Sequence, residues 1–176
     1  VPDVITREWI ASQPSPYRYL CEYLAEKTYR RGDKVLKQMP VGWQKIRLIC
    51  HLEAEVESNG FDGYFGNMTL DDRTIAEVPD ALEALRQMDV TELARIVDEA
   101  LTIWQNFVKF QLSERRRNKK ATGNAVRRPR RAREGLDHIE EGLDPLYDRF
   151  SEKQVTWVRQ IDRYIKLHPD EFAHDK

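Results

Sequence analysis

The sequence contains no long apolar run and no convincing stretch in which apolar and polar residues alternate. The first absence argues against a membrane-spanning helix, which requires roughly eighteen or more apolar residues in a row. The second argues against β-strands, so we expect an all-α protein. Asp3, Arg7 and Glu8 interrupt the amino-terminal segment and argue against a secretion signal.

Cysteine is scarce, because Cys21 and Cys50 are the only two and each lies within an apolar helical pattern. That setting is typical of free, buried thiols in a reducing compartment, and it supplies no disulfide framework. We therefore predict unpaired thiols and a cytoplasmic location.

Common catalytic and cofactor-binding signatures are also missing. The four histidines are scattered, and the chain has no nucleophile elbow, phosphate-binding loop or zinc-protease motif. His51 lies one turn from Glu55 and can pair with it on a helix, but a lone helical histidine is more often structural. We predict that the protein is not an enzyme and binds no metal or cofactor.

A chain of 176 residues with 40% hydrophobic content can bury one substantial core, so we expect a single compact domain over residues 1–176. The helical spacing of its apolar residues predicts about seven to nine helices. Ser151–Gln154 has the form of a capping box that would open the final helix, and Pro169 would end it. Apolar residues recur at helical spacing over 17–28, 43–56, 81–88, 93–112, 136–150 and 155–165.

The net charge of −1 conceals a strong segregation of charge. Between positions 115 and 133 there are ten basic residues and no acidic ones, while the other 157 residues hold 19 basic and 30 acidic side chains. This basic insertion has few apolar residues, so we expect a mobile loop or a pair of frayed helix ends. Its basic residues are Arg115, Arg116, Arg117, Lys119, Lys120, Arg127, Arg128, Arg130, Arg131 and Arg133.

The acidic surplus is concentrated between residues 51 and 99, which hold thirteen acidic side chains and three arginines. Such side chains can be the solvated faces and first turns of helices, where they stabilise the helix dipole. They can also form a binding surface. The candidates for that surface are Asp71, Asp72, Glu77, Asp80, Glu83, Asp89, Glu92, Asp98 and Glu99.

The segment from Glu55 to Asn67 combines three aromatic residues, three glycines and two asparagines directly after an apolar helical stretch. This pattern resembles a bacterial all-helical domain family of unknown function whose namesake is a DNA-mimic protein. The resemblance extends over about residues 15–170. The matching letters are Glu55, Val56, Gly60, Phe61, Tyr64, Phe65 and Asn67, whereas Glu57, Ser58, Asn59 and Gly63 depart from the commoner ones.

This family motif has two interpretations. In the structural one, which we favour, Phe61, Tyr64 and Phe65 plug the core at a tight glycine-containing turn. In the functional one, polar side chains of the motif surround a small pocket or contact surface. That set comprises Glu53, Glu55, Asn59, Asp62, Tyr64 and Asn67.

Two binding hypotheses follow from the charge distribution. The resemblance implies a protein partner such as a DNA-binding regulator, whose DNA-binding face the acidic body would occupy by imitating phosphate charge. Alternatively, the basic insertion binds nucleic acid without sequence specificity, because it lacks interleaved aromatic residues for base stacking. The sequence leaves the oligomeric state open, a homodimer included.

Overall fold

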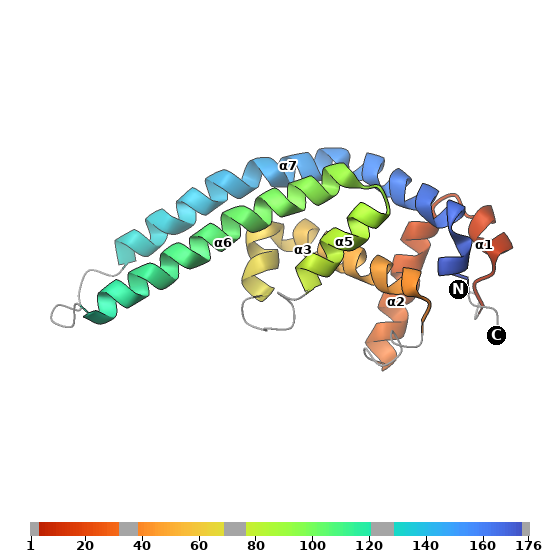
Figure 1. Cartoon of the computed structure of the whole chain (residues 1–176), viewed down its shortest axis with the longest axis horizontal. Coiled ribbons are helices and arrows are strands. Elements are labelled where there is room, and N and C mark those ends of the chain that lie inside the picture. Colours follow the sequence, from red (N-terminus) through yellow and green to blue (C-terminus); the bar gives the residue numbers. More distant parts are fainter. Residues whose placement is uncertain (1–3, 32–38, 69–76, 121–128, 174–176) are drawn as a thin grey trace.

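The computed structural model describes residues 4–31, 39–68, 77–120 and 129–173. Within these ranges the chain forms six α-helices and one 3₁₀ turn (Figure 1). The side chains of 27–31, 67–68, 114–120, 129–138 and 140 lie outside this description. None of the described residues lies in a β-strand, which confirms the all-α prediction. The elements are α1 (Arg7–Ser12), α2 (Pro16–Arg31), α3 (Val41–Met68), α5 (Glu77–Gln87), α6 (Thr91–Lys120), α7 (Pro129–Leu167) and η2 (Pro169–Glu171).

A long antiparallel hairpin of α6 and α7 forms one layer of the molecule (Figure 1). The helices α1, α2, α3 and α5 pack against one side of it, and α3 contacts α2, α5, α6 and α7. At its tip the hairpin extends beyond α3 and α5, while α1 and η2 lie at the opposite end (Figure 1).

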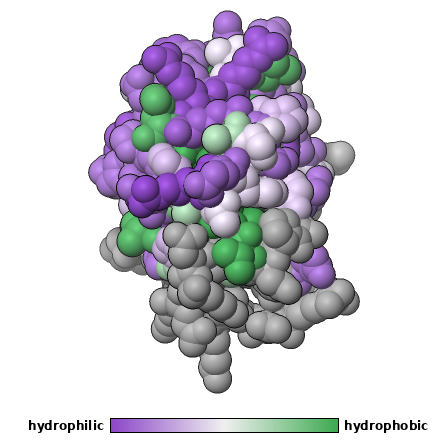
Figure 2. Space-filling model, turned by 90° about the vertical axis from the view of Figure 1, so that its right-hand side faces the viewer, coloured by the Kyte–Doolittle hydropathy of each residue, from purple (hydrophilic) through white to green (hydrophobic). Residues whose placement is uncertain are grey.

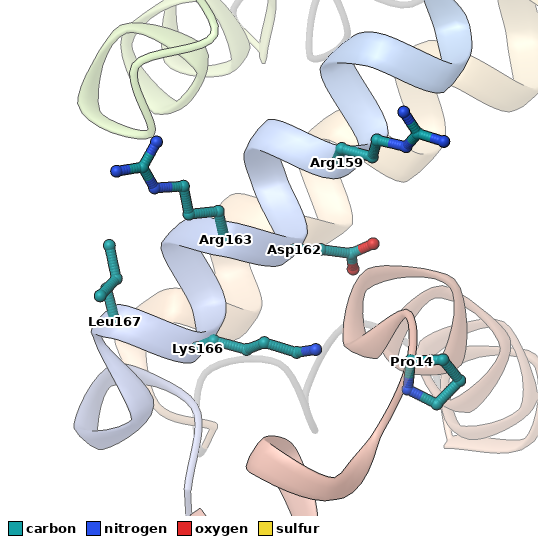
Figure 3. Close-up of a pocket in the computed structure, with 6 residues that line it drawn as sticks. All are labelled: Pro14, Arg159, Asp162, Arg163, Lys166 and Leu167. Carbon is teal, nitrogen blue, oxygen red and sulfur yellow. The ribbon is translucent and has the colours of Figure 1, made fainter.

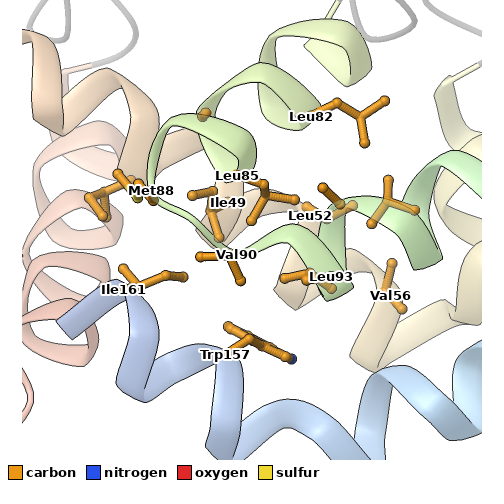
Figure 4. Close-up of a cluster of buried hydrophobic side chains, with 14 of the residues drawn as sticks. Ile49, Leu52, Val56, Leu82, Leu85, Met88, Val90, Leu93, Trp157 and Ile161 are labelled. Atoms are coloured by element: carbon orange, nitrogen blue, oxygen red, sulfur yellow. The ribbon is translucent and has the colours of Figure 1, made fainter. Parts of the chain in front are cut away.

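The core forms where α3, α5, α6 and α7 converge (Figure 4). The helix α3 contributes Leu52, which faces Leu85 from α5, Leu93 from α6 and Trp157 from α7. All four side chains are at most 2% exposed. Their spacing follows the helical period of each segment, which is why the sequence pattern could locate this core.

The helix α7 is longer than predicted, because it continues through Ser151–Gln154 and does not restart there. The capping-box prediction is therefore wrong. Pro145 also lies inside this helix. The face that carries Phe150 and Trp157 is buried on both sides of the supposed boundary, and this burial outweighs the local capping signal. Because the predicted segments merge in this way, the described residues contain fewer helices than the sequence suggested.

The helix α6 also continues into the basic insertion and ends at Lys120, although the apolar pattern ends at Leu112. The helix α7 begins at Pro129, so part of the expected loop has a helical backbone. Arg and Lys are good helix formers, which a search for apolar faces does not detect. Residues 121–128 lie outside the described part of the chain.

The family motif is a kink within α3. Gly60 has a φ of 67° and a ψ of −179°, and helix continues on both sides of it. A positive φ of this kind favours glycine, because a Cβ would be strained there. Phe61 and Phe65 are 1% and 2% exposed, with their ring centroids 6.1 Å apart. The structural interpretation of these aromatic residues is confirmed, although the turn is a kink between two helical segments.

The two cysteines form a disulfide, which overturns the prediction that both are free thiols. Cys21 lies on α2 and Cys50 on α3, and their Cα atoms are 5.9 Å apart. Two neighbouring helices bring together residues that are 29 positions apart in the sequence. The helical pattern of each segment gave no indication of this pairing.

The carboxyl-terminal turn is anchored to the start of α3. The Trp43 indole Nε1 donates a hydrogen bond to the carbonyl oxygen of Phe172 at 2.6 Å, and the Phe172 ring is fully buried. A Cβ on Gly42 would lie 2.5 Å from that ring, so only glycine fits at this contact.

Replacing Phe61 or Phe65 with Ala should lower the free energy of unfolding by about 3 to 5 kcal/mol, because each change leaves a cavity in the core. Denaturant titration followed by helical circular dichroism measures this loss. The matched control is Phe110→Ala, whose ring is 49% exposed and which should change stability far less. Equal effects at the buried and exposed positions would contradict the packing described.

Removing the disulfide with the double change Cys21→Ser and Cys50→Ser should cost about 3 to 4 kcal/mol, because the unfolded chain regains the entropy of an open loop. The parent protein in reductant should lose a similar amount, whereas the double variant should be insensitive to reductant. Equal stability of the oxidised and reduced parent protein would show that the cross-link contributes nothing.

Candidate functional site

The carboxylate of Glu53 is the main buried charge of the family motif, and its residue is 4% exposed. It accepts hydrogen bonds from the Tyr17 hydroxyl at 2.8 Å and from the Gln154 amide at 2.9 Å. The Arg18 guanidinium forms an ion pair with it at 2.7 Å. A carboxylate at this depth needs such partners, since an unpaired one would be strongly destabilising. These contacts make Glu53 the junction of α2, α3 and α7.

Tyr17 shares this environment and is fully buried. Burial raises the pKa of its hydroxyl well above the usual value, and the adjacent Glu53 carboxylate raises it further. Tyr17 therefore acts as a neutral hydrogen-bond donor to Glu53.

The polar residues of the motif do not gather around one described pocket. Glu53 faces α2 and α7, whereas Glu55 accepts a hydrogen bond from Asn59 at 3.3 Å on an exposed part of α3. Asp62 is exposed, Tyr64 is buried, and the side chain of Asn67 lies outside the described part of the chain. The arrangement gives the described part of the motif a packing role.

His51 lies beside Glu77 and Tyr64. Its Nδ1 is 3.9 Å from a Glu77 oxygen, and its ring packs edge-on against Tyr64 with the centroids 6.3 Å apart. Arg47 forms the closer ion pair with Glu77, at 2.9 Å. Burial raises the pKa of Tyr64, and the charges of Glu77 and Glu55 add to the rise. Among the described residues, no group of three His, Cys, Asp or Glu side chains lies close enough to hold a metal ion.

The structure separates the nine acidic candidates into three sets. Asp71 and Asp72 lie outside the described residues. Glu77, Glu92 and Glu99 form ion pairs with arginines. The remaining acidic candidates, which are exposed, are Asp80, Glu83, Asp89 and Asp98.

Glu92 and Glu99 belong to a four-residue network across α6 and α7. Arg95 contacts both carboxylates from within α6, and Arg149 reaches both from α7 at 3.2 and 2.9 Å. The hydrogen bond from Arg95 lowers the pKa of Glu92, and that from Arg149 lowers it further. Two positive and two negative charges cancel here, so this part of the surface has little net field.

A row of four exposed carboxylates lies along α7, and the sequence interpretation missed it. Leu143 and Phe150 are buried on the opposite face of the same helix, so the row points to solvent. The spacing of three, four and four residues, which places side chains on one helical face, could have revealed it. This acidic ridge consists of Glu141, Asp144, Asp148 and Glu152.

Residues 37–168 match the sequence profile of the DMP19-like protein family, three-quarters of the chain. The chain belongs to this family. The match confirms the family that the motif around Gly60 suggested, within the range of about 15–170 given by the resemblance. Comparisons of this DMP19-like chain with curated proteins and with solved structures find no significant match.

Two further sequence predictions concern membrane-spanning helices and the basic insertion. Across the ranges that the structure describes, no helix combines the length and hydropathy needed to cross a membrane. The basic side chains from Arg115 to Arg133 lie outside the described part of the chain, so the structure gives no contacts for them.

Replacing Tyr17 with Phe should lower stability at neutral pH by about 1 to 3 kcal/mol, because the buried Glu53 carboxylate loses one donor. The same change should also reduce the loss of unfolding free energy that the parent protein shows at alkaline pH. A raised folded-state pKa gives a contribution that is complete below about pH 10, the unfolded tyrosine value, and is lost as the pH rises above it. Denaturation between pH 7 and 11 measures both effects.

The control for this experiment is Tyr19→Phe, a half-buried tyrosine on the same helix. It should retain the alkaline loss of stability seen in the parent protein. If the Tyr17 variant lost as much stability at alkaline pH as the parent protein, the role assigned to the Tyr17 hydroxyl would be contradicted.

Proposed function

We propose that the protein acts by binding another protein, presenting carboxylates to the basic, DNA-binding face of a regulator in place of DNA phosphates. Membership of the DMP19-like family supports a role of this class. The observation that carries the proposal for this chain is the acidic ridge on α7, where four carboxylates point away from the core.

The geometry of the ridge suits a linear array of positive charges. Glu152 lies eleven positions after Glu141, which corresponds to about 16 Å along a helix. A single DNA strand places a phosphate about every 3.4 Å along its axis, so the ridge has fewer charges over the same length. We therefore propose that it imitates part of one strand, and that exposed acids such as Asp98 widen the surface.

The proposed role is non-enzymatic. The buried Glu53 of the family motif is engaged with Tyr17 and Arg18 of α2 and with Gln154 of α7. Polar groups committed to packing in this way are suited to holding helices together. The proposal assigns the partner contact to exposed ridge carboxylates such as Asp144, Asp148 and Glu152.

Nucleic-acid binding by the basic residues 115–133 is the alternative carried from the sequence. A nonspecific contact of this kind would weaken steeply with salt, with a log–log slope of about −0.9 per phosphate neutralised. Tight duplex binding that persists at about 0.15 M salt would contradict the mimic proposal, since a decoy that imitates DNA should not hold it.

Competition with DNA tests the proposed function. Partners are first captured from a nuclease-treated bacterial lysate, and a DNA-binding protein among them is then titrated against labelled duplex in the presence of this chain. The parent chain should displace the duplex. The double variant Asp144→Asn and Asp148→Asn should do so about tenfold less effectively, because it lacks half of the ridge charge.

A second double variant with the same net charge as the ridge variant controls for the general effect of removing two negative charges. Glu22→Gln and Asp62→Asn remove two exposed carboxylates from α2 and α3 and should leave the competition close to that of the parent. Equal behaviour of the two double variants would refute the ridge as the binding surface. Failure of duplex to compete at all would refute mimicry.

A further inference from the structure

A shallow groove of about 350 Å³ lies between the last turns of α7 and the segment that joins α1 to α2 (Figure 3). Figure 3 shows Lys166 and Asp162 extending from α7 toward Pro14, and Arg163 extending to the other side of the helix. Figure 2 looks onto this end of the molecule, where hydrophilic side chains dominate and hydrophobic ones reach the surface in patches. The groove is lined by Pro14, Arg159, Asp162, Arg163, Lys166 and Leu167.

The groove has a positive net charge. Arg159, Arg163 and Lys166 are exposed cations, and Asp162 is the only acid in the lining, which gives a net charge of +2. Both oxygens of Asp162 accept hydrogen bonds, from the Ser15 hydroxyl and from the backbone N–H of Tyr17, each at 2.8 Å. Asp162 therefore caps the start of α2, and its single negative charge leaves the three cations with a surplus of two.

Helix stability alone does not account for all three cations. Lys166 is in the last turn of α7, where a positive charge favours the helix dipole, whereas Arg163 lies one turn earlier, where this effect has faded. Arg159 lies eight residues before the end of the helix, beyond the reach of that effect. Arg159 and Lys166 are seven residues apart and share one side of α7, so the positive surface extends along about two turns.

The lining also includes exposed apolar surface. Leu167 is 65% exposed, and Pro14 is exposed on the opposite side of the groove. A ligand that fits this combination carries carboxylates for the cations and an aliphatic side chain for Leu167. That chemistry belongs to an acidic segment of a protein that also contains leucine-like residues.

The neighbouring acidic ridge disfavours an extended polyanion. Glu152 lies seven residues before Arg159, about 10 Å along the same helix, and Asp148 follows one turn further away. A nucleic acid lying along α7 would leave the groove and meet these carboxylates. A short acidic segment can occupy the groove without reaching the ridge.

We propose that this cationic groove is a second interaction surface, and that it binds a short acidic segment of a partner protein. The groove and the acidic ridge have opposite charge and different lining residues, so this inference does not depend on the proposed mimic function. The two can fail separately.

Fluorescence anisotropy of a labelled acidic peptide rich in Glu and Leu tests the groove directly. The parent chain should bind this peptide and should not bind the same peptide with Gln in place of Glu. The triple variant Arg159→Gln, Arg163→Gln and Lys166→Gln should bind about tenfold more weakly, since each exposed ion pair contributes a factor of about two to five. Circular dichroism checks that the variant is folded.

The matched control removes three exposed cations elsewhere, with Arg86→Gln, Lys109→Gln and Lys153→Gln. It should bind the acidic peptide like the parent. Equal weakening in both triple variants would overturn the proposal, as would absence of peptide binding by the parent. Stronger displacement of the peptide by inorganic phosphate or short duplex DNA than by unlabelled acidic peptide would also overturn it, because the groove would then be a general anion site. The duplex competition for the ridge is unaffected by any of these outcomes.

Discussion

The buried Glu53 carboxylate is the contact that fixes how the helices are arranged. A charge that is 4% exposed must retain its hydrogen bonds, and its partners come from two other helices, Tyr17 and Arg18 on α2 and Gln154 on α7. Apolar packing alone would allow these helices to slide or rotate with little change in buried area. The hydrogen bonds have a defined geometry, so they select one register among the possible packings. Asp162 adds a second link between α7 and α2 by capping Ser15 and Tyr17.

The same constraint explains why α7 is continuous. Gln154 belongs to the segment that resembles a capping box, yet its amide is engaged with Glu53 on another helix. Trp157 and Ile161 then continue the buried face for two further turns. Tertiary contacts on both sides of Ser151 hold the backbone helical, and the outer face of this one long helix is exposed to solvent.

Helical periodicity was sufficient to predict the fold class and most of the core, because buried residues such as Leu93 and Val97 recur at 3.6-residue spacing. The family motif was also readable, since glycine at a positive φ and clustered aromatic residues are local features. The pairing of Cys21 with Cys50 was not, because it depends on how two helices pack. The neutralisation of Glu92 and Glu99 by Arg149 likewise arises from a contact between helices. The acidic ridge has a spacing that a helical pattern could reveal. It lies outside residues 51–99, the densest acidic region, from which the sequence candidates were chosen.

The continuity of α7 has a mechanical consequence. The acidic ridge and the cationic groove both lie on α7. Asp148 and Arg163 are fifteen residues apart, or about 22 Å along the helix axis. The helix is curved (Figure 1), but its packing against other helices along its length holds that shape, so the separation is fixed. A partner that carried a basic patch and an acidic segment at the matching separation would gain avidity, because the first contact would hold the second at high effective concentration. A partner with any other separation would be limited to one contact at a time.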